Sequence, residues 1–195
     1  MGQGAGNDWD AGYRRGRYAF LRRPQEQLRL DEIARIVETI TRRHGACEVA
    51  DIGCGEGLLA SRLNSASITR YVGVDLSRTA LSRMPKAAFP VSAVCSALGD
   101  WDGRPVGNAP RVLIASEVLY YDAEGVAHLR RLAETVRSTV AVIVSCVAGK
   151  QDKPNWQTAS VRLWRELARA GWPELARQHL ANGDLAWDIA AYDLA

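Results

Sequence analysis

Residues 49–57, with the sequence VADIGCGEG, constrain the fold of this chain more than any other segment. A short apolar run ends beside Asp51, and glycines follow at positions 53, 55 and 57. Glycines in this arrangement turn the chain sharply out of a strand and let backbone N–H groups approach a ligand closely. A second apolar run, residues 71–74, ends in Asp75, whose carboxylate suits the two hydroxyls of a ribose. The pattern predicts a nucleoside-containing cofactor at the carboxyl edge of a parallel sheet.

The glycine spacing distinguishes between classes of cofactor. A dinucleotide-binding loop has the pattern G-x-G-x-x-G, and its third glycine would stand where this chain has Leu58. The run G-x-G-x-G, preceded by Asp51, resembles motif I of the class I S-adenosylmethionine-dependent methyltransferases. That resemblance implies S-adenosylmethionine as the cofactor, which has no pyrophosphate and needs no phosphate-binding helix N-terminus. A nicotinamide or flavin site, and a tight turn without any ligand, are the alternatives.

The resemblance also implies which residues contact the cofactor. The methionine part would be framed by Asp51, Gly53, Cys54, Gly55 and Gly57. Asp75 would hold the ribose hydroxyls through charge-assisted hydrogen bonds, and Leu76 would pack against the adenine. The alternative for Asp75 alone is a helix N-cap.

The chain departs from the family pattern at the residue that would contact the adenine amino group. Family members often carry an acid after the third strand, and the matching position here is Ala97. The adenine would then be bound by backbone groups near Ala97 and Leu98, or by Asp100. Ser116, at the end of the fourth expected strand, completes the expected set of cofactor-binding residues.

Residues 115–121, ASEVLYY, match the motif IV region, which lies beneath the transferable methyl group. By position, Glu117, Tyr120 and Tyr121 are the candidate catalytic side chains. A neutral amine needs no strong base before it attacks, whereas a hydroxyl or an acidic carbon benefits from one. Glu117 equally fits a helix-start carboxylate that backbone N–H groups satisfy. The segment is similar to the nodulation N-methyltransferases, which act on chitooligosaccharide amino groups.

Residues 9–20 mix aromatic side chains with arginines. Trp9-Asp10 and Arg17-Tyr18-Ala19 are similar to N-terminal elements of the same N-methyltransferases. Such a segment is either a lid that packs its aromatic side chains over the cofactor or a frayed tail. As a lid, it would aim Arg17 at the cofactor carboxylate and line the acceptor pocket with Tyr18, and its closure would exclude water.

Strand and helix patterns alternate along the chain. Apolar runs predict strands at 47–52, 71–74, 91–95, 111–115 and 140–147. Helical spacing predicts helices at 24–44, 58–63, 79–84, 126–136 and 161–170. Segments 176–180 and 185–192 flank Asn182-Gly183 and predict a hairpin. The order indicates an α/β, Rossmann-like fold with a seven-stranded, mostly parallel sheet, a C-terminal antiparallel hairpin and an N-terminal helical cap.

Composition is consistent with a single methyltransferase domain over residues 1–195, with a cap and helix at 1–45 and a cofactor-binding core at 46–195. The hydrophobic fraction of 47% and charged fraction of 24% are typical of a soluble globular protein. The four cysteines lack the spacing of a zinc site, so no metal is expected. No apolar segment is long enough to span a bilayer and no signal-peptide pattern is evident. We therefore expect a cytoplasmic monomer or homodimer without a membrane partner.

The charge of the chain bears on its acceptor. A net charge of +3 implies no strong polyanionic partner, yet arginines gather between positions 14 and 43. A solvated helix face is one explanation, and an anionic substrate or nucleic acid is the other. DNA amino-methyltransferases carry an Asn/Asp-Pro-Pro-aromatic sequence after the fourth strand, and this chain lacks it. Residues 14–20 weakly interleave arginine with aromatic residues, which keeps an RNA target as an alternative.

Together these patterns predict an S-adenosylmethionine-dependent methyltransferase that acts on a nitrogen or an oxygen of a small molecule. An amino sugar or another specialised metabolite is the expected kind of acceptor, and nucleic acid is not. One alternative is a catalytically silent methyltransferase-like domain that binds the cofactor or a partner. The other is an RNA methyltransferase.

Overall fold

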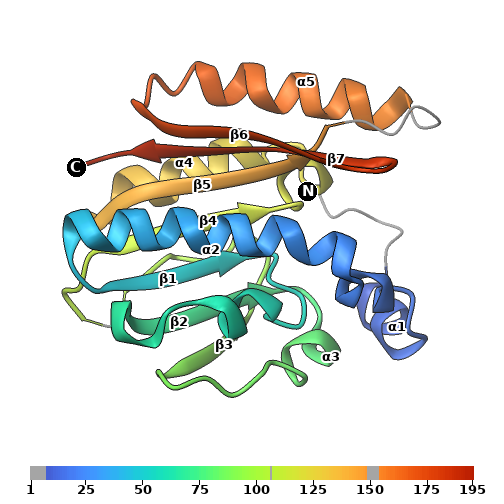
Figure 1. Cartoon of the computed structure of the whole chain (residues 1–195), viewed down its shortest axis with the longest axis horizontal. Helices are drawn as coiled ribbons and strands as arrows, with labels where there is room; N and C mark the ends of the chain where they lie inside the picture. The colour runs from blue at the N-terminus through green and yellow to red at the C-terminus, as the bar shows by residue number, and fades with distance from the viewer. Residues whose placement is uncertain (1–7, 106, 149–153) are drawn as a thin grey trace.

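In the part of the chain that the structure describes, seven strands form one sheet in the order β3-β2-β1-β4-β5-β7-β6 (Figure 1). The computed structural model describes residues 8–105, 107–148 and 154–195. The strands are β1 (Cys47–Ile52), β2 (Ile68–Asp75), β3 (Val91–Cys95), β4 (Arg111–Ser116), β5 (Thr139–Val147), β6 (Glu174–Asn182) and β7 (Leu185–Asp193). Each strand predicted from an apolar run is present, and β2 begins at Ile68 rather than at position 71.

Strand β7 runs antiparallel to the other strands of the sheet. Strands β3, β2, β1, β4 and β5 pair in parallel, whereas β7 pairs antiparallel with both β5 and β6. Asn182 pairs with Leu185 across a two-residue turn, in which Gly183 has φ +60°. Glycine adopts this left-handed conformation without steric cost, which suits a tight hairpin. The predicted mostly parallel sheet with a C-terminal antiparallel hairpin is confirmed.

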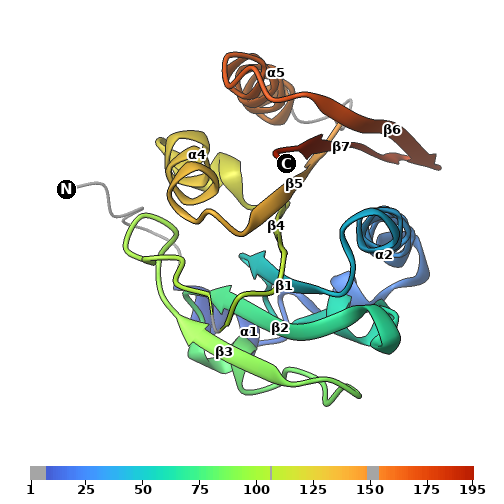
Figure 2. The same ribbon diagram turned by 90° about the vertical axis from the view of Figure 1, so that its left-hand side faces the viewer.

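Helices cover both faces of the sheet (Figure 2). The helices are α1 (Trp9–Arg14), α2 (Pro24–His44), α3 (Arg78–Leu81), α4 (Gly125–Thr135) and α5 (Pro154–Ala168), with 3₁₀ turns η1 (Ala19–Arg22), η2 (Leu58–Arg62), η3 (Ser65–Ser67) and η4 (Leu119–Tyr121). Helix α2 buries Ile33 and Ile40 against one face of the sheet. Helices α4 and α5 bury Leu129 and Leu163 against the other. No helix in the described part of the chain is long and apolar enough to cross a membrane.

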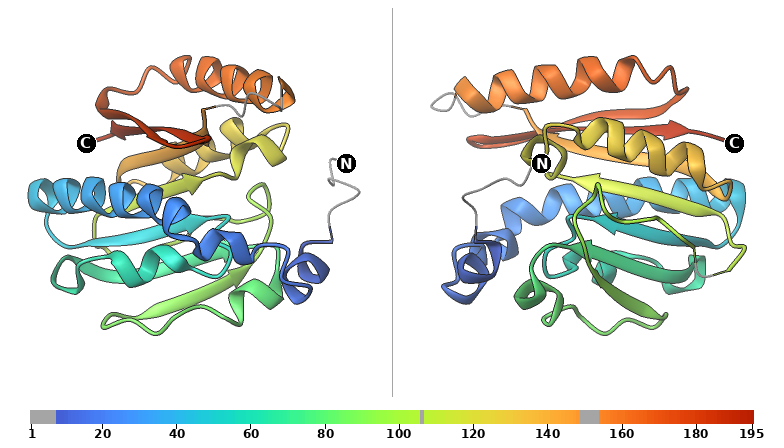
Figure 3. Two further views of the ribbon diagram at one scale, coloured as in Figure 1. Left: turned by 45° about the vertical axis from the view of Figure 1, so that its right-hand side comes forward. Right: turned by 180° about the vertical axis from the view of Figure 1, so that it is seen from behind.

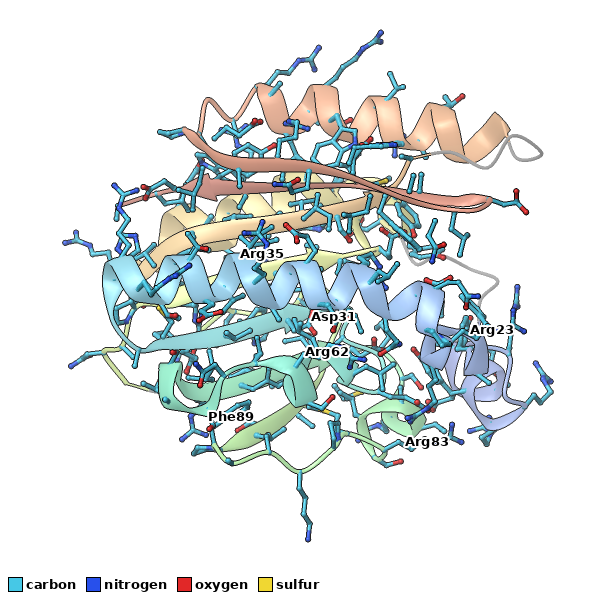
Figure 4. All side chains as sticks on the ribbon, in the orientation of Figure 1. Arg23, Asp31, Arg35, Arg62, Arg83 and Phe89 are labelled. Carbon is cyan, nitrogen blue, oxygen red and sulfur yellow. The ribbon has the colours of Figure 1, made fainter. Side chains whose placement is uncertain are left out.

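Helix α2 has the bounds predicted from the sequence. Pro24 is its first residue, where a fixed φ is favourable, and Gly45 caps its end with φ +86°. Arg62 of η2 donates through Nε to Asp31 of α2 at 2.8 Å, and Figure 4 shows the two side chains between these elements.

The predicted helix at 58–63 is wrong, because the structure has the short 3₁₀ turn η2 there. Its N-cap residue Gly57 is left-handed and no side chain caps the first turn. A segment of five residues without a cap does not repay the cost of nucleating an α-helix.

The N-terminal segment packs onto the rest of the molecule as the predicted cap (Figure 1). Helix α1 lies against α3, where the Asp10 carboxylate accepts hydrogen bonds from Ser77 Oγ at 2.6 Å and from the Thr79 N–H at 2.9 Å. Asp8 caps the start of α1 by accepting from the Ala11 N–H at 2.8 Å. These contacts fix α1, so the alternative of a frayed tail over residues 9–20 is wrong.

Candidate cofactor site

The carboxyl ends of β1, β2 and β4 meet at one edge of the sheet. The strand order reverses direction between β1 and β4, and ligands of open α/β sheets bind outside the carboxyl ends at such a point. The loops 53–57, 76–77 and 117–121 follow these strands, and α1 lies beside them (Figure 3). The predicted site residues therefore lie at one edge of the molecule.

Residues 53–57 form a turn that depends on glycine. Gly53, Gly55 and Gly57 have φ values of +68°, +57° and +66°, in the left-handed region that other residues rarely adopt. The N–H groups of Gly53 and Cys54 donate to the Val74 carbonyl at 2.7 and 3.1 Å. The loop is thereby fixed to the end of β2.

The space around this loop is narrow. A Cβ atom at Gly53 would lie 2.4 Å from Val118 Cγ2, and one at Gly55 would lie 2.4 Å from Tyr13 Oη. Within the sheet, a Cβ atom on Gly73 of β2 would lie 2.8 Å from Cys54 Sγ. The segment that follows β4 therefore packs against one side of the glycine loop, and the cap packs against the other side.

Asp75 ends β2 with its carboxylate turned to the glycine loop. Oδ2 accepts from the Gly55 N–H and Oδ1 from the Ser77 N–H, each at 2.8 Å. Burial raises the pKa of Asp75, and these two backbone N–H groups oppose the shift. The N-cap of α3 is Ser77, whose Oγ accepts from the Ala80 N–H, so the N-cap alternative for Asp75 is wrong. Each carboxylate oxygen has a second acceptor position, so Asp75 can bind two hydroxyls while it holds the loop.

An apolar residue and unused donors lie next to Asp75. Leu76 is 55% exposed, which is unusual for a leucine that follows a buried strand. The Ser96 N–H donates to the Asp75 carbonyl at 3.1 Å, which places the loop after β3 beside β2. Within the described residues, the N–H groups of Ala97 and Leu98 have no acceptor. Leu76 offers a face for a flat ring, and these amides offer donors to its edge.

Asp51 lies beneath the glycine loop rather than on its exposed side. It is 5% exposed and accepts a hydrogen bond from Tyr71 Oη at 2.5 Å. Burial raises the pKa of Asp51 to about 7, while the Tyr71 hydrogen bond and the Arg29 guanidinium oppose the shift. Asp51 therefore supports the end of β1 from within the core.

Arg29 of α2 is a buried cation that reaches the end of β4. Its Nη1 donates to Ser116 Oγ, and its Nε is buried without an acceptor among the described residues. The sequence analysis counted Arg29 among the arginines between positions 14 and 43, and left a solvated helix face and an anionic ligand open for them. Its spacing to Ile33, Ile36 and Ile40 was the available signal, because it places Arg29 on the buried stripe of α2.

Glu117 stands directly after β4 in a strained conformation. Its φ of +59° is the only left-handed value at a non-glycine residue in the described ranges, which costs roughly 1–3 kcal/mol. Its carboxylate accepts from Tyr120 Oη at 2.9 Å, from Ser145 Oγ at 3.2 Å and from the Val147 N–H at 3.2 Å. Helix α4 begins at Gly125, so the helix-start alternative for Glu117 is wrong.

Aromatic side chains connect the cap to η4. Trp9 packs edge-on against Tyr121 with ring centroids 5.1 Å apart, and stacks on Tyr18 at 5.8 Å. Tyr121 in turn lies 4.6 Å from the ring of Tyr120. Arg17 is exposed, and its guanidinium lies 6.0 Å from the Tyr18 ring centroid. We call Trp9, Tyr13, Tyr18, Tyr120 and Tyr121 the aromatic cluster.

Tyr13, one of the aromatic residues expected in the lid, makes a contact with the glycine loop that sequence reasoning did not assign. It is 7% exposed, lies 4.5 Å from the Tyr18 ring, and places its hydroxyl at Gly55. Burial, with the nearby Asp75 carboxylate, raises its pKa. Its position four residues after Trp9, on the same face of a helix, was the signal that could have identified it.

Other parts of the described chain offer less. No group of three or more histidine, cysteine or acidic side chains is placed to hold a metal ion in residues 8–105, 107–148 and 154–195. A surface cavity of about 650 Å³ lies at the amino edge of the sheet, between residues 102, 104–105 and 107–108 on one side and residues 135–138 on the other. It does not border the loops described above.

Comparison with known proteins identifies the fold. No protein-family model matches the chain, and no curated protein matches it. The methyltransferase domain of bacterial CtHen1 matches with a TM-score of 0.64 and 20% identity, over 87% of this chain and all of that one. The 1,6-didemethyltoxoflavin-N1-methyltransferase of Burkholderia thailandensis, with bound S-adenosylhomocysteine, matches with a TM-score of 0.65 and 15% identity, over 95% of this chain and 85% of that one. The chain has the methyltransferase fold.

The nodulation protein that the sequence resembles is also a structural match. The N-methyltransferase NodS of Bradyrhizobium japonicum, in complex with S-adenosylhomocysteine, has a TM-score of 0.60 and 16% identity, over 96% of this chain and 93% of that one. At such identities the likeness supports the methyltransferase fold and leaves the chemistry to be argued from the residues of this chain.

Proposed function

We propose that this protein is an S-adenosylmethionine-dependent methyltransferase that acts on an amine nitrogen of a small molecule. The observation that carries the proposal is the arrangement of Asp75 beside the glycine loop. Its carboxylate accepts from the Gly55 and Ser77 N–H groups, and each of its oxygens has a second acceptor position that can receive a ribose hydroxyl.

The remaining residues at this edge fit the parts of the cofactor. Asp75 would bind the ribose diol, Leu76 would cover the adenine, and the amides of Ala97 and Leu98 would meet its ring edge. Arg17 is an exposed cation without an ion-pair partner among the described residues, and it would bind the methionine carboxylate. Tyr13 Oη, at the glycine loop, would donate to the same carboxylate.

When bound, S-adenosylmethionine supplies an activated methyl group on a sulfonium centre. The chain's own residues then have to align the acceptor and exclude water. Tyr18 and Tyr121 belong to the aromatic cluster beside the expected position of the methyl group, and they would form the walls of the acceptor pocket. Ser116 and Glu117 would form its floor.

The hydrogen bonds of Glu117 favour an amine over a hydroxyl acceptor. Three donors, from Tyr120, Ser145 and the Val147 amide, already bind its carboxylate. A carboxylate so occupied is a poor general base, because proton uptake would cost hydrogen bonds to its charged form. A neutral amine attacks without prior deprotonation, whereas a hydroxyl does not. In this proposal, Glu117 would position Tyr120 through their hydrogen bond. Tyr120 and Tyr121 would contact the acceptor.

Calorimetry with S-adenosylhomocysteine tests the cofactor assignment. We expect a dissociation constant in the micromolar range, about −8 kcal/mol, for the unmodified chain. Asp75→Ala should lose about 2 kcal/mol, as expected for a charged hydrogen-bonding group. Gly55→Val should abolish binding, because its side chain would enter the space between the loop and Tyr13.

Gly171→Val is the matched control for the glycine variant. Gly171 has φ +68° but no atom within 4 Å of a Cβ position, so its substitution adds the same backbone strain away from the site. The control should bind the cofactor normally. Clear binding of NAD by the unmodified chain, with no heat from S-adenosylhomocysteine, would contradict the proposal. Cofactor binding without turnover on a panel of primary and secondary amines would instead favour the silent-domain alternative.

A further inference from the structure

The positive charge of this protein is concentrated on the cap. Residues 8–23 hold five arginines against two aspartates, which equals the net charge of +3 of the whole chain. Residues 24–195 are therefore electrically balanced. An arginine preference spread over solvated helix faces would not place the whole excess on a single segment of sixteen residues.

The acids of the cap form no ion pair with its arginines among the described residues. Asp8 is bound to the start of α1, and Asp10 is bound to Ser77 and Thr79 of α3. Arg22 pairs with Glu56 of the glycine loop at 2.5 Å. The other four cap arginines are exposed and form no ion pair with any residue in the described ranges: Arg14, Arg15, Arg17 and Arg23.

The cap that carries these cations is fastened to the candidate site. Arg22 and Arg83 both contact Glu56, and Arg83 also donates to the Tyr13 carbonyl at 3.1 Å, so the cap is fastened over the glycine loop. Figure 4 shows Arg23 beside the cap and Arg83 beside α3, at the end of the molecule that the carboxyl ends of the strands face. A cofactor carboxylate needs one of the free cations, and the others remain for a second anion.

We propose that the methyl acceptor carries a phosphate or carboxylate group, which Arg14, Arg15 and Arg23 bind at the rim of the site. This inference rests on the proposed function and names the class of its substrate. The sulfonium of the donor is itself cationic, so an anionic acceptor complements both the rim and the bound donor. The rim would raise the local concentration of such an acceptor and orient its neutral amine toward the aromatic cluster.

The size of the charged surface favours a small molecule over a nucleic acid. Helix α1 has six residues and is about 9 Å long, which matches one or two anionic groups. A bound polynucleotide would require cations that continue along the surface, and the rest of the chain has no excess of them. The exposed Phe20 and Tyr121 offer stacking surfaces, so RNA is the outcome that the test must distinguish.

The test is an NMR titration of the isotope-labelled protein with inorganic pyrophosphate, with and without saturating S-adenosylhomocysteine. We expect shifts confined to residues 9–23 and their contacts. Arg14→Gln/Arg15→Gln should weaken pyrophosphate binding by about fivefold or more, since two of three rim charges are lost. The matched control is Arg42→Gln/Arg137→Gln, which removes the same charge at the amino edge of the sheet and should leave binding unchanged.

The outcomes separate the possible explanations. Equal weakening in the cap variant and the control would reduce the effect to net charge and would overturn the inference. A single-stranded RNA dodecamer that binds more than about a hundredfold tighter than pyrophosphate, with a steep salt dependence, would replace the small anion with RNA. If the unmodified protein binds pyrophosphate at the cap but does not bind S-adenosylhomocysteine, the proposed function is refuted and the anion site remains supported.

Discussion

The two ends of β4 each hold a buried arginine, and the two arginines differ in how completely they are paired. At the amino end, Arg111 is fully buried, donates to Glu48 through Nε at 2.7 Å and through Nη2, donates to the Gly103 carbonyl, and stacks over Trp101 at 5.7 Å. At the carboxyl end, Arg29 donates to Ser116 and keeps its Nε unpaired among the described residues. Each of the three guanidinium nitrogens of Arg111 has a partner, whereas Arg29 has one buried nitrogen without a partner among the described residues.

The carboxyl edge shows the same incomplete pairing elsewhere. Glu117 has a strained backbone, and four of the five cap arginines form no ion pair with a described residue, Arg22 being the exception. Strain and unsatisfied polar groups persist where the surrounding structure and a function require them. The ion pair between Arg111 and Glu48 is therefore expected to contribute mainly stability, and the carboxyl edge mainly binding.

The largest effect should come from breaking the fully paired end. Arg111→Met leaves the buried Glu48 carboxylate without its cation and should lower the free energy of unfolding by about 3–5 kcal/mol. Arg29→Met removes one hydrogen bond and one unpaired group, and should cost only about 1–2 kcal/mol. Urea denaturation of both variants measures the difference. Equal losses would show that the two ends of β4 do not differ in this way.

The pH dependence of stability sharpens the comparison at Asp51. Its pKa is about 7 in the folded chain against an ordinary 3.8, so the folded state binds the proton more tightly than the unfolded state. The resulting stability is fully present below about pH 4 and is lost as the pH rises toward 7, with a slope of at most about 1.4 kcal/mol per pH unit.

Asp51→Asn should remove that dependence, because the amide oxygen still accepts from Tyr71 and does not titrate. The raised pKa of Asp75 acts in the same direction in both proteins, so the difference between them isolates Asp51. Denaturant titrations at several pH values between 5 and 8 provide the measurement. Parallel stability curves for the two proteins would mean that Asp51 is ionised throughout.

The smallest effect concerns the hairpin, which lies away from the proposed site. Gly183→Ala forces a Cβ atom into a turn at φ +60° and should cost about 1 kcal/mol of stability. Cofactor affinity should not change. Asp184→Ala is the control, because Asp184 is the neighbouring turn residue and has no positive φ. It should hardly change stability in thermal unfolding. A loss of stability as large as that of Gly183→Ala would contradict the explanation from backbone strain.

The sequence predicted the sheet well because its signals are local. Apolar runs, the glycine spacing and the Asn182-Gly183 turn each depend on a few adjacent residues, and the strands and hairpin follow from them. The 3₁₀ turn η2 was predicted as an α-helix, because the apolar pattern over five residues does not distinguish an α-helix from a 3₁₀ turn without a capping side chain.

The site was predicted only in part because its contacts are tertiary. The position of Asp75 beside the loop follows from strand order, and so could be expected from the sequence. The approach of Tyr13 to Gly55 and the reach of Arg29 to Ser116 depend on how the cap and α2 pack, which no local pattern encodes. The burial of Arg29 could have been expected from its place on the apolar stripe of α2, but the sequence analysis did not use that position.

Hydrogen exchange with and without S-adenosylhomocysteine tests most directly the claim that the cofactor binds between the glycine loop and the cap. We expect residues 9–20, 53–57 and 75–77 to gain protection, because the ligand would tie together segments that otherwise open separately. The hairpin of β6 and β7 serves as an internal control and should exchange as before. Protection that appears elsewhere, or exchange in the cap and loop that does not respond to the cofactor, would contradict the account.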